Sequence, residues 1–196
     1  MKRILCLLLL ALLCTAASGL AETPSNVLVA YFSRAGENYS VGRIEQGNTE
    51  KLAEIISTQT EADLFRIETV IAYPEDYEAT KTVAWDEYQN DVRPELAAVI
   101  ENWEQYDTVF IGYPIWWGRM PMALLTFLES YDFSGKTVIP FATHEGSGMG
   151  RSERTLKNAL PKAKLGASLA VRGATAQNDR DAARKTVNAW LAKQGF

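Results

Sequence analysis

The chain has 196 residues, a length that fits one medium-sized domain rather than two. Apolar residues make up 47% and charged residues 22%, a balance typical of a packed globular protein and not of a disordered, collagen-like or coiled-coil chain. Lys and Arg total 20 against 24 Asp and Glu, so the net charge is −4. An acidic balance without a basic cluster argues against a nucleic-acid-binding protein.

The N-terminal segment has the three parts of a secretory signal peptide. Basic residues open it, Ile4 to Leu13 is an apolar run, and Gly19 to Ala21 supplies the small residues of a cleavage site. The apolar run is too short to span a bilayer stably, so we expect no stable membrane insertion of the mature chain. We predict a signal peptide over residues 1–21 and an exported domain, periplasmic or extracellular, over residues 22–196. A retained anchor and a lipoprotein site at Cys14 are the alternatives.

Cleavage would restrict the chemistry of the mature domain. Both cysteines, Cys6 and Cys14, would leave with the signal peptide, which removes thiols and disulfides. His144 is the only histidine, which excludes a multi-histidine metal site. We therefore expect neither dithiol redox chemistry nor a metal centre.

Short apolar runs predict strands buried on both faces, as in a parallel sheet. In chain order these runs are Asn26 to Phe32, Leu64 to Ile67, Thr108 to Tyr113, Thr137 to Ala142 and Ala167 to Val171.

Helical spacing of apolar residues lies between these runs. In chain order the helical patterns are Leu52 to Ile56, Leu96 to Trp103, Leu124 to Leu128, Leu156 to Leu160 and Val187 to Leu191. Residues 70–92 read instead as a long polar connection. Five strands alternating with five helical segments predict an α/β, doubly wound sandwich, a parallel sheet with helices on both faces. In such folds ligands bind beyond the carboxyl ends of the strands, so the loops after the first, third and fourth strands are the candidate site.

The loop after the first strand is rich in small polar residues and leads into a helix. It begins with Ser33, Arg34 and Ala35, and Asn48 and Thr49 open the helix. Free N–H groups and the positive end of a helix attract phosphate, so we predict a phosphate cradle here. An ordinary capped loop is the alternative.

The loop after the third strand contains adjacent tryptophans. Its candidate ligand-binding residues are Pro114, Ile115, Trp116, Trp117 and Gly118. Neighbouring side chains point in different directions, so we expect at least one indole to leave the interior and offer a flat face to a planar ring. Packing of both indoles against the next helix is the alternative.

The loop after the fourth strand is rich in glycine, which permits close backbone approach to a ligand. Its candidate residues are Thr143, His144, Glu145, Gly146, Ser147 and Gly148. Such a backbone can form hydrogen bonds with the edge of a polar heterocycle. A solvated loop histidine is the alternative reading of His144.

A phosphate cradle, an aromatic face and a glycine-rich edge together describe a flavin mononucleotide (FMN) site. Residues 26–196 resemble the flavodoxin-like family through VLVAYFSRAG with GNTEKLAEII, through YPIWWGRMP and through PFATHEGSGMG. The resemblance implies a five-stranded parallel sheet in the order 2-1-3-4-5. It also implies non-covalent FMN, with its phosphate at the first loop and its isoalloxazine between the second and third.

One departure from the family pattern is an insertion, Glu37 to Gln46, that divides the expected phosphate loop. It adds Tyr39 and Arg43, which can close over the ribityl chain or lie on the surface. The exact phosphate ligands therefore stay open at this point.

Three functions fit this sequence. We favour an electron-transfer protein that passes single electrons to a redox partner protein or a small electron acceptor outside the cytoplasm, and we assign no catalytic residue. The first alternative is an FMN-dependent NAD(P)H/quinone-type oxidoreductase, in which His144, Tyr73 and Tyr77 shape an acceptor pocket. Export counts against it, because the NAD(P)H pool is cytoplasmic. The second alternative is a flavin-free interaction module.

Overall fold

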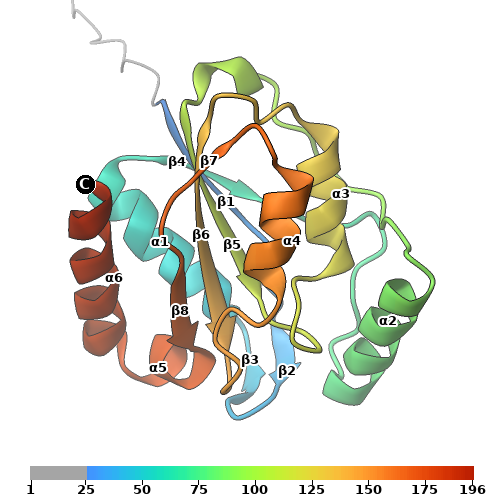
Figure 1. The fold of residues 1–196 in the computed structure, drawn as a ribbon. Coiled ribbons are helices and arrows are strands. Elements are labelled where there is room, and N and C mark those ends of the chain that lie inside the picture. Colours follow the sequence, from blue (N-terminus) through green and yellow to red (C-terminus); the bar gives the residue numbers. More distant parts are fainter. Residues whose placement is uncertain (1–25) are drawn as a thin grey trace, which may run out of the picture.

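The computed structural model describes residues 26–196, and the predicted signal peptide lies outside them. The centre of the molecule is a six-stranded parallel sheet with the strand order β4-β1-β5-β6-β7, in which β8 also pairs with β6 (Figure 1). The strands are β1 (Val27–Tyr31), β4 (Asp63–Arg66), β5 (Thr108–Pro114), β6 (Thr137–His144), β7 (Lys164–Leu165) and β8 (Leu169–Arg172).

The predicted strand order is confirmed, with one difference at the last position. Two short strands share that position, β7 beside the beginning of β6 and β8 beside its end. Between them Gly166 lies so close to Ile139 that an added Cβ would be 3.1 Å from its side chain. The chain then leaves the sheet, and the carbonyl of Ala167 accepts a hydrogen bond from the Trp190 indole. The predicted fifth strand, Ala167 to Val171, therefore corresponds to β8, and the short β7 before it was not predicted.

Helices cover both faces of the sheet, as expected. Figure 1 shows α1, α5 and α6 on one face and α3 and α4 on the other. Their bounds are α1 (Asn48–Thr60), α3 (Met122–Ser130), α4 (Ser152–Ala159), α5 (Gly173–Asn178) and α6 (Arg180–Gln194).

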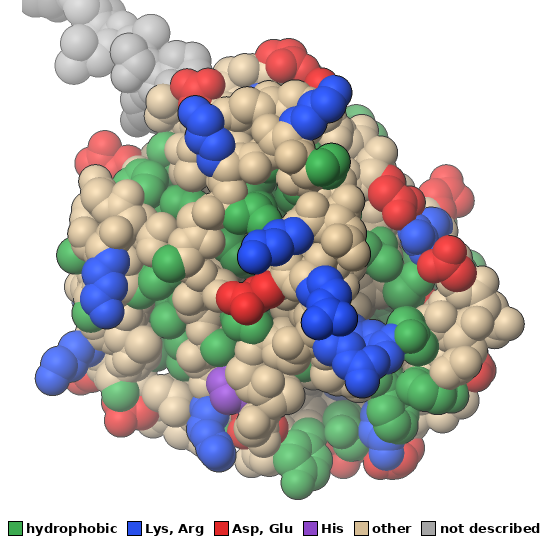
Figure 2. Space-filling view, viewed as in Figure 1, with side chains coloured by type: hydrophobic (Ala, Val, Ile, Leu, Met, Phe, Trp, Pro, Cys, Tyr) green, Lys and Arg blue, Asp and Glu red, His purple; other side chains and the backbone are tan. Residues whose placement is uncertain are grey.

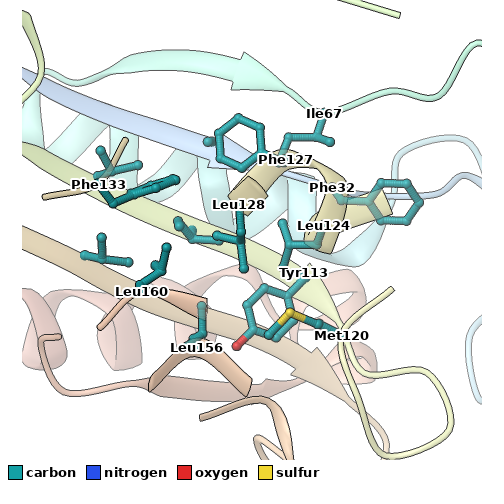
Figure 3. Close-up of a cluster of buried hydrophobic side chains, with 14 of the residues drawn as sticks. Phe32, Ile67, Tyr113, Met120, Leu124, Phe127, Leu128, Phe133, Leu156 and Leu160 are labelled. Carbon is teal, nitrogen blue, oxygen red and sulfur yellow. The ribbon is translucent and has the colours of Figure 1, made fainter. Parts of the chain in front are cut away.

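Two hydrophobic cores lie on either side of the sheet because side chains alternate along each strand. In β5, Ile111 and Tyr113 join the core beneath α3 and α4, whereas Phe110 joins the core beneath α1 and α6. Figure 3 shows the first core, in which Phe127 and Leu156 meet the strand side chains. Packing on both faces fixes the carboxyl ends of the strands at one edge of the molecule.

The helix predicted over Leu96 to Trp103 is wrong. Leu96 forms an isolated antiparallel bridge with Thr69, and the backbone N–H of Ala97 donates to Glu68 at 2.9 Å. Only a 3₁₀ turn, η1 (Trp103–Gln105), follows. The helical spacing of apolar residues was accidental here. The backbone groups of this segment pair with residues 68–69 of the same chain instead of with each other in a helix.

The prediction of a polar connection without secondary structure over residues 70–92 is also wrong. This segment contains a helix, α2 (Tyr77–Gln89). The side chain of Asp76 caps the helix by accepting a hydrogen bond from the Ala79 N–H at 2.7 Å. Only Thr80 and Ala84 are buried, and the aromatic side chains of Trp85 and Tyr88 are exposed. Tyr77, Ala84, Trp85 and Tyr88 recur at helical spacing, a pattern that the sequence analysis did not use.

The insertion forms a hairpin of two antiparallel strands, β2 (Gly36–Asn38) and β3 (Gly42–Ile44), separate from the main sheet. The N–H of Glu37 donates to the carbonyl of Glu75 at 2.7 Å, which joins the hairpin to the segment before α2. The hairpin and α2 thus stand together beside the carboxyl edge of the sheet (Figure 1). Within residues 26–196, no helix is long and apolar enough to cross a membrane.

Candidate functional site

A cleft of about 220 Å³ lies at the carboxyl edge of the sheet. This volume is somewhat below the lower end of the range for small-molecule sites, which is about 300 Å³. The loops after β1, β5 and β6 contribute to its walls, as the topology requires, and so do the β2–β3 hairpin and α2.

One end of the cleft is formed by the first turn of α1. Gly47 precedes this helix without a side-chain cap, and the hydroxyl of Ser33 accepts a hydrogen bond from the Glu50 N–H at 3.1 Å. The N–H groups of Asn48 and Thr49 have no acceptor within the helix, because they belong to its first turn. A Cβ at Gly47 would be 2.1 Å from Ser33 Oγ, so only glycine permits this approach. The result is a cluster of backbone donors at a positive helix end.

One polar atom in each of two side chains at this end lacks a hydrogen-bond partner. Asn48 Oδ1 and Arg34 Nε are buried, and neither has a hydrogen-bond partner in the described part of the chain. Both residues line the cleft. The other nitrogens of the Arg34 guanidinium are held by backbone carbonyls, with Nη1 donating to Pro74 at 2.9 Å and to Glu75 at 3.0 Å. Burial lowers the pKa of Arg34 from its ordinary value, yet arginine keeps its charge.

These groups suit an anion. Buried polar groups without partners are costly in a folded protein. An anionic oxygen can accept hydrogen bonds from Arg34 Nε, from the Asn48 amide group and from the free backbone N–H groups at the same time.

Some predicted phosphate ligands lie behind the cleft rather than in it. Thr49 is buried, and its hydroxyl forms a 2.8 Å hydrogen bond with the hydroxyl of Thr143, which does line the cleft. Ser33 and Ala35 line a separate hollow next to Arg34. In the free protein these side chains organise the loop and connect the start of α1 to the end of β6.

The tryptophans form the opposite wall. Residues 116–119 make a tight turn in which Trp116 and Arg119 exchange two backbone hydrogen bonds of 2.8 and 2.9 Å. Trp117 (φ 51°) and Gly118 (φ 71°) both occupy the left-handed region, as in a type I′ turn. This backbone is uncommon for a bulky residue and marks a strained, candidate functional position.

The two indoles face different surroundings, as the sequence predicts. Trp116 is half-buried and packs edge-on against Phe32 and Tyr73, with ring centroids 5.4 and 5.1 Å away. Trp117 is 50% exposed, and its Nε1 donates to the carbonyl of Lys81 in α2 at 3.0 Å. Both rings line the cleft with Pro114 and Ile115, whereas Gly118 lies in the turn outside the lining.

The end of β6 supplies the third wall through His144 and Glu145. His144 Nδ1 accepts a hydrogen bond from the Gly146 N–H at 2.8 Å, so the neutral ring carries its proton on Nε2. Burial lowers the pKa of His144, with Arg172 acting in the same direction and Glu145 against it. Glu145 Oε1 accepts from the Ala174 N–H at 2.8 Å. The remaining loop residues, Gly146, Ser147 and Gly148, do not line the cleft.

The hairpin and α2 add six residues to the cleft lining. Tyr39 and Tyr77 were named from the sequence, as a residue that can close over the ribityl chain and as part of the alternative acceptor pocket, whereas Asn38, Thr80, Lys81 and Ala84 were not. The Tyr39 and Tyr77 rings lie 6.0 Å apart. Arg43 instead pairs with Glu75, and the hydroxyl of Tyr73 donates to Glu87 at 2.8 Å, so neither residue lines the cleft. The capping residue Asp76 and the helical spacing of Tyr77, Ala84, Trp85 and Tyr88 are sequence signals that could have revealed α2.

No group of three or more histidine, cysteine, aspartate and glutamate side chains suited to a metal ion occurs among residues 26–196.

Comparison with known proteins identifies the class. A flavodoxin family model matches residues 26–192, so the chain belongs to the flavodoxin family. Among solved structures, a candidate flavoprotein from Bacteroides eggerthii is 31% identical, with 84% of this chain and 97% of that chain covered and a TM-score of 0.66. A candidate flavoprotein from Bacteroides uniformis is 29% identical, with coverages of 87% and 99% and a TM-score of 0.66.

A more distant likeness concerns the fold alone. A flavoprotein from Lactobacillus acidophilus, solved in complex with FMN, is 21% identical, with coverages of 84% and 97% and a TM-score of 0.61. A search of curated proteins found no match. FMN, the cofactor expected from the sequence, is the cofactor of the family to which this chain belongs.

Proposed function

We propose that this protein binds FMN non-covalently in the cleft and acts as an electron-transfer flavoprotein outside the cytoplasm. The observation that carries the proposal is the polarity of the cleft. One end presents the free N–H groups of α1 with the unpartnered Asn48 and Arg34 groups, and the other presents Trp116 and Trp117. FMN has the same polarity, with a phosphate at one end and a planar ring at the other.

In this assignment each wall of the cleft binds a different part of FMN. The first turn of α1, Asn48 and Arg34 bind the phosphate. Trp116 and Trp117 pack against the ring system and exclude water from it. His144 offers its Nε2–H as a hydrogen-bond donor, and its Nδ1 is already held by Gly146. Bound FMN would supply the ability to accept and donate electrons singly or in pairs.

The binding experiment compares FMN with riboflavin, which lacks the phosphate. We expect FMN to bind to the purified protein with a stoichiometry of one and riboflavin to bind much more weakly, measured by quenching of flavin fluorescence. Equal affinity for the two would remove the phosphate cradle from the proposal. Absence of binding for both would favour the flavin-free interaction module.

The electron-carrier assignment is favoured by the acidic net charge of −4 and by the predicted export, since soluble NAD(P)H is a cytoplasmic donor. The alternative, an NAD(P)H/quinone-type oxidoreductase, is favoured by α2, because Tyr77 and Lys81 extend the cleft beyond the three family loops. Steady-state assays with NADH and NADPH separate the two. Rapid turnover of either nucleotide with a quinone would support the oxidoreductase.

The proposed location depends on the signal peptide over residues 1–21. Expression of the full chain, fractionation of the cells and N-terminal sequencing of the product provide the test. We expect an exported product that begins at residue 22. A cytoplasmic product that retains Met1 would contradict this part of the proposal.

A further inference from the structure

A second groove, of about 260 Å³, lies between the end of α2 and α4. Arg119, Arg151 and Arg154 line it, together with Tyr88. Figure 2 shows basic side chains gathered beside α4 on this face of the molecule. The concentration of positive charge is unexpected, because acidic residues outnumber basic ones in the chain as a whole.

The three guanidinium groups have no carboxylate partners. Within residues 26–196, no ion pair or hydrogen bond involves the guanidinium group of Arg119, Arg151 or Arg154, and only the backbone carbonyl of Arg151 accepts a side-chain hydrogen bond, from Thr155 Oγ1 at 3.3 Å. Arg119 lies over the Tyr88 ring, 3.5 Å from its centroid, and its Nε is buried without a partner. Burial and the neighbouring charge of Arg151 lower the pKa of Arg119. The groove thus holds like charges close together without compensation, an arrangement that an anionic ligand would relieve.

Nearby acidic groups do not neutralise the groove. Asp91 lines it, but Asp91 Oδ1 accepts a 2.7 Å hydrogen bond from Arg93. Glu153 accepts a hydrogen bond from the hydroxyl of Ser168. Asp91 is therefore already paired with Arg93, and Glu153 does not line the groove.

The remaining lining is apolar. Met120, Met122 and Leu125 complete the groove between the arginines. Inorganic phosphate would leave this surface exposed to water, whereas a molecule with an apolar body and an anionic end would cover it.

The groove continues toward the FMN cleft. A small hollow between them is lined by Tyr88, Arg119 and Met120 on the groove side and by Trp116 and Trp117 on the cleft side. The turn at residues 116–119 therefore separates the two sites and contributes to both.

We propose that this groove binds an organic anion, with a carboxylate or phosphate held by Arg119, Arg151 and Arg154 and an apolar body resting on Met120, Met122 and Leu125. As a deepening of the proposed function, and resting on it, the bound molecule would be one that exchanges electrons with the flavin. Binding itself depends only on the groove.

Isothermal titration calorimetry on the FMN-saturated protein, in which the cleft is filled, tests the binding with three probes that share one ring system. These are 2-naphthoate, 2-naphthyl phosphate and the neutral 2-naphthamide. We expect at least one of the acids to bind about tenfold or more tightly than the amide and to lose affinity as ionic strength rises. A preference for the carboxylate or for the phosphate identifies the anionic group. Equal affinity for all three probes, or no binding of either acid, would overturn the proposal.

Substitutions localise the effect. Arg151→Gln and Arg154→Gln combined should weaken binding of the preferred acid by about tenfold or more, as expected when hydrogen bonds to a charged group are lost. Arg184→Gln, at an exposed arginine of α6 on the opposite face, is the charge-matched control and should leave the affinity unchanged. An equal loss in both variants would refute the assignment to the groove. FMN retention is measured before the probes are added, so a failure of the probes to bind leaves the FMN proposal intact and a failure to bind FMN is recognised separately.

Discussion

Asn48 illustrates how a single side chain can be suited to a ligand rather than to the fold. Its buried Oδ1 has no hydrogen-bond partner in the described structure, although it sits in the first turn of a well-packed helix. A buried polar group left unsatisfied costs roughly 1–3 kcal/mol. Oδ1 can only accept a hydrogen bond, so a ligand hydroxyl beside Asn48 would offset that cost, while the NH₂ of the same amide can donate to a phosphate.

The first prediction follows from this imbalance. Asn48→Ala should weaken FMN binding by about 1–2 kcal/mol and leave riboflavin binding unchanged, because the lost hydrogen bond involves the charged phosphate. The free energy of unfolding of the flavin-free protein should stay equal or rise slightly, because alanine is the better helix former. Flavin titration and urea unfolding measure the two effects. Asn188→Ala, at an exposed position in α6, is the control. A large loss of stability with unchanged FMN affinity would contradict the assignment.

Gly47 gives the second prediction. Gly47→Ala places a Cβ against Ser33 Oγ and Arg34 O, at 2.1 and 2.7 Å, so the loop must move. We expect a loss of about 1–3 kcal/mol in the free energy of unfolding, as for overpacking elsewhere, and a weakened affinity for FMN. Gly42→Ala in the β2–β3 hairpin is the control, because its added Cβ meets nothing within 4 Å and only its φ of 70° is unfavourable. Thermal and chemical unfolding should show a smaller loss for Gly42→Ala.

His144 gives a prediction about pH. Its pKa in the folded protein is below the ordinary 6.5, chiefly through burial. As pH falls below 6.5, the unfolded chain takes up a proton that the folded protein does not, so this contribution to stability is present above pH 6.5 and is lost at lower pH. His144→Asn keeps an acceptor for the Gly146 N–H without titrating. The difference in unfolding free energy between the parent and this variant should change across that interval and be constant above it. A difference independent of pH would contradict the burial of His144.

At the scale of elements, the strands and the apolar helices were predictable because burial on two faces leaves a periodic pattern. The core-facing Leu52, Ile55 and Ile56 of α1 are an example. The hairpin and α2 were not predictable as cleft walls. They are held by a cap at Asp76, by backbone contacts such as Glu37 with Glu75 and by the packing of Trp85 on Trp117, and none of these is part of the core beneath the sheet. The same elements supply the cleft residues that the sequence analysis missed.

Helix α2 should therefore be the least stable wall of the cleft. Asp76→Ala removes the capping hydrogen bond to Ala79, at a cost of about 1 kcal/mol. We expect faster amide hydrogen exchange confined to residues 77–89 and a weaker affinity for FMN. Asp179→Ala, which removes the equivalent cap of α6 at Ala182, is the matched control. It should speed exchange in α6 and leave FMN binding unchanged. Global destabilisation by Asp76→Ala would show that α2 does not open locally.

At the scale of the whole molecule, the doubly wound topology brings three loops that are distant in sequence to one edge of the sheet. That topology was predictable from alternating periods, and it located the cleft near Arg34, Trp116 and His144. The side-chain roles were less predictable. Thr49 has the residue type of a phosphate ligand, yet its hydroxyl bonds Thr143 behind the cleft, and only the packed structure places it there.

The central claim is that this cleft holds FMN for electron transfer. The direct measurement is an anaerobic spectroelectrochemical titration of the purified protein after saturation with FMN and removal of free flavin. We predict one FMN retained per chain and reduction in two separable one-electron steps. A protein that retains no FMN, or one whose flavin reduces in a single two-electron step, would contradict the account.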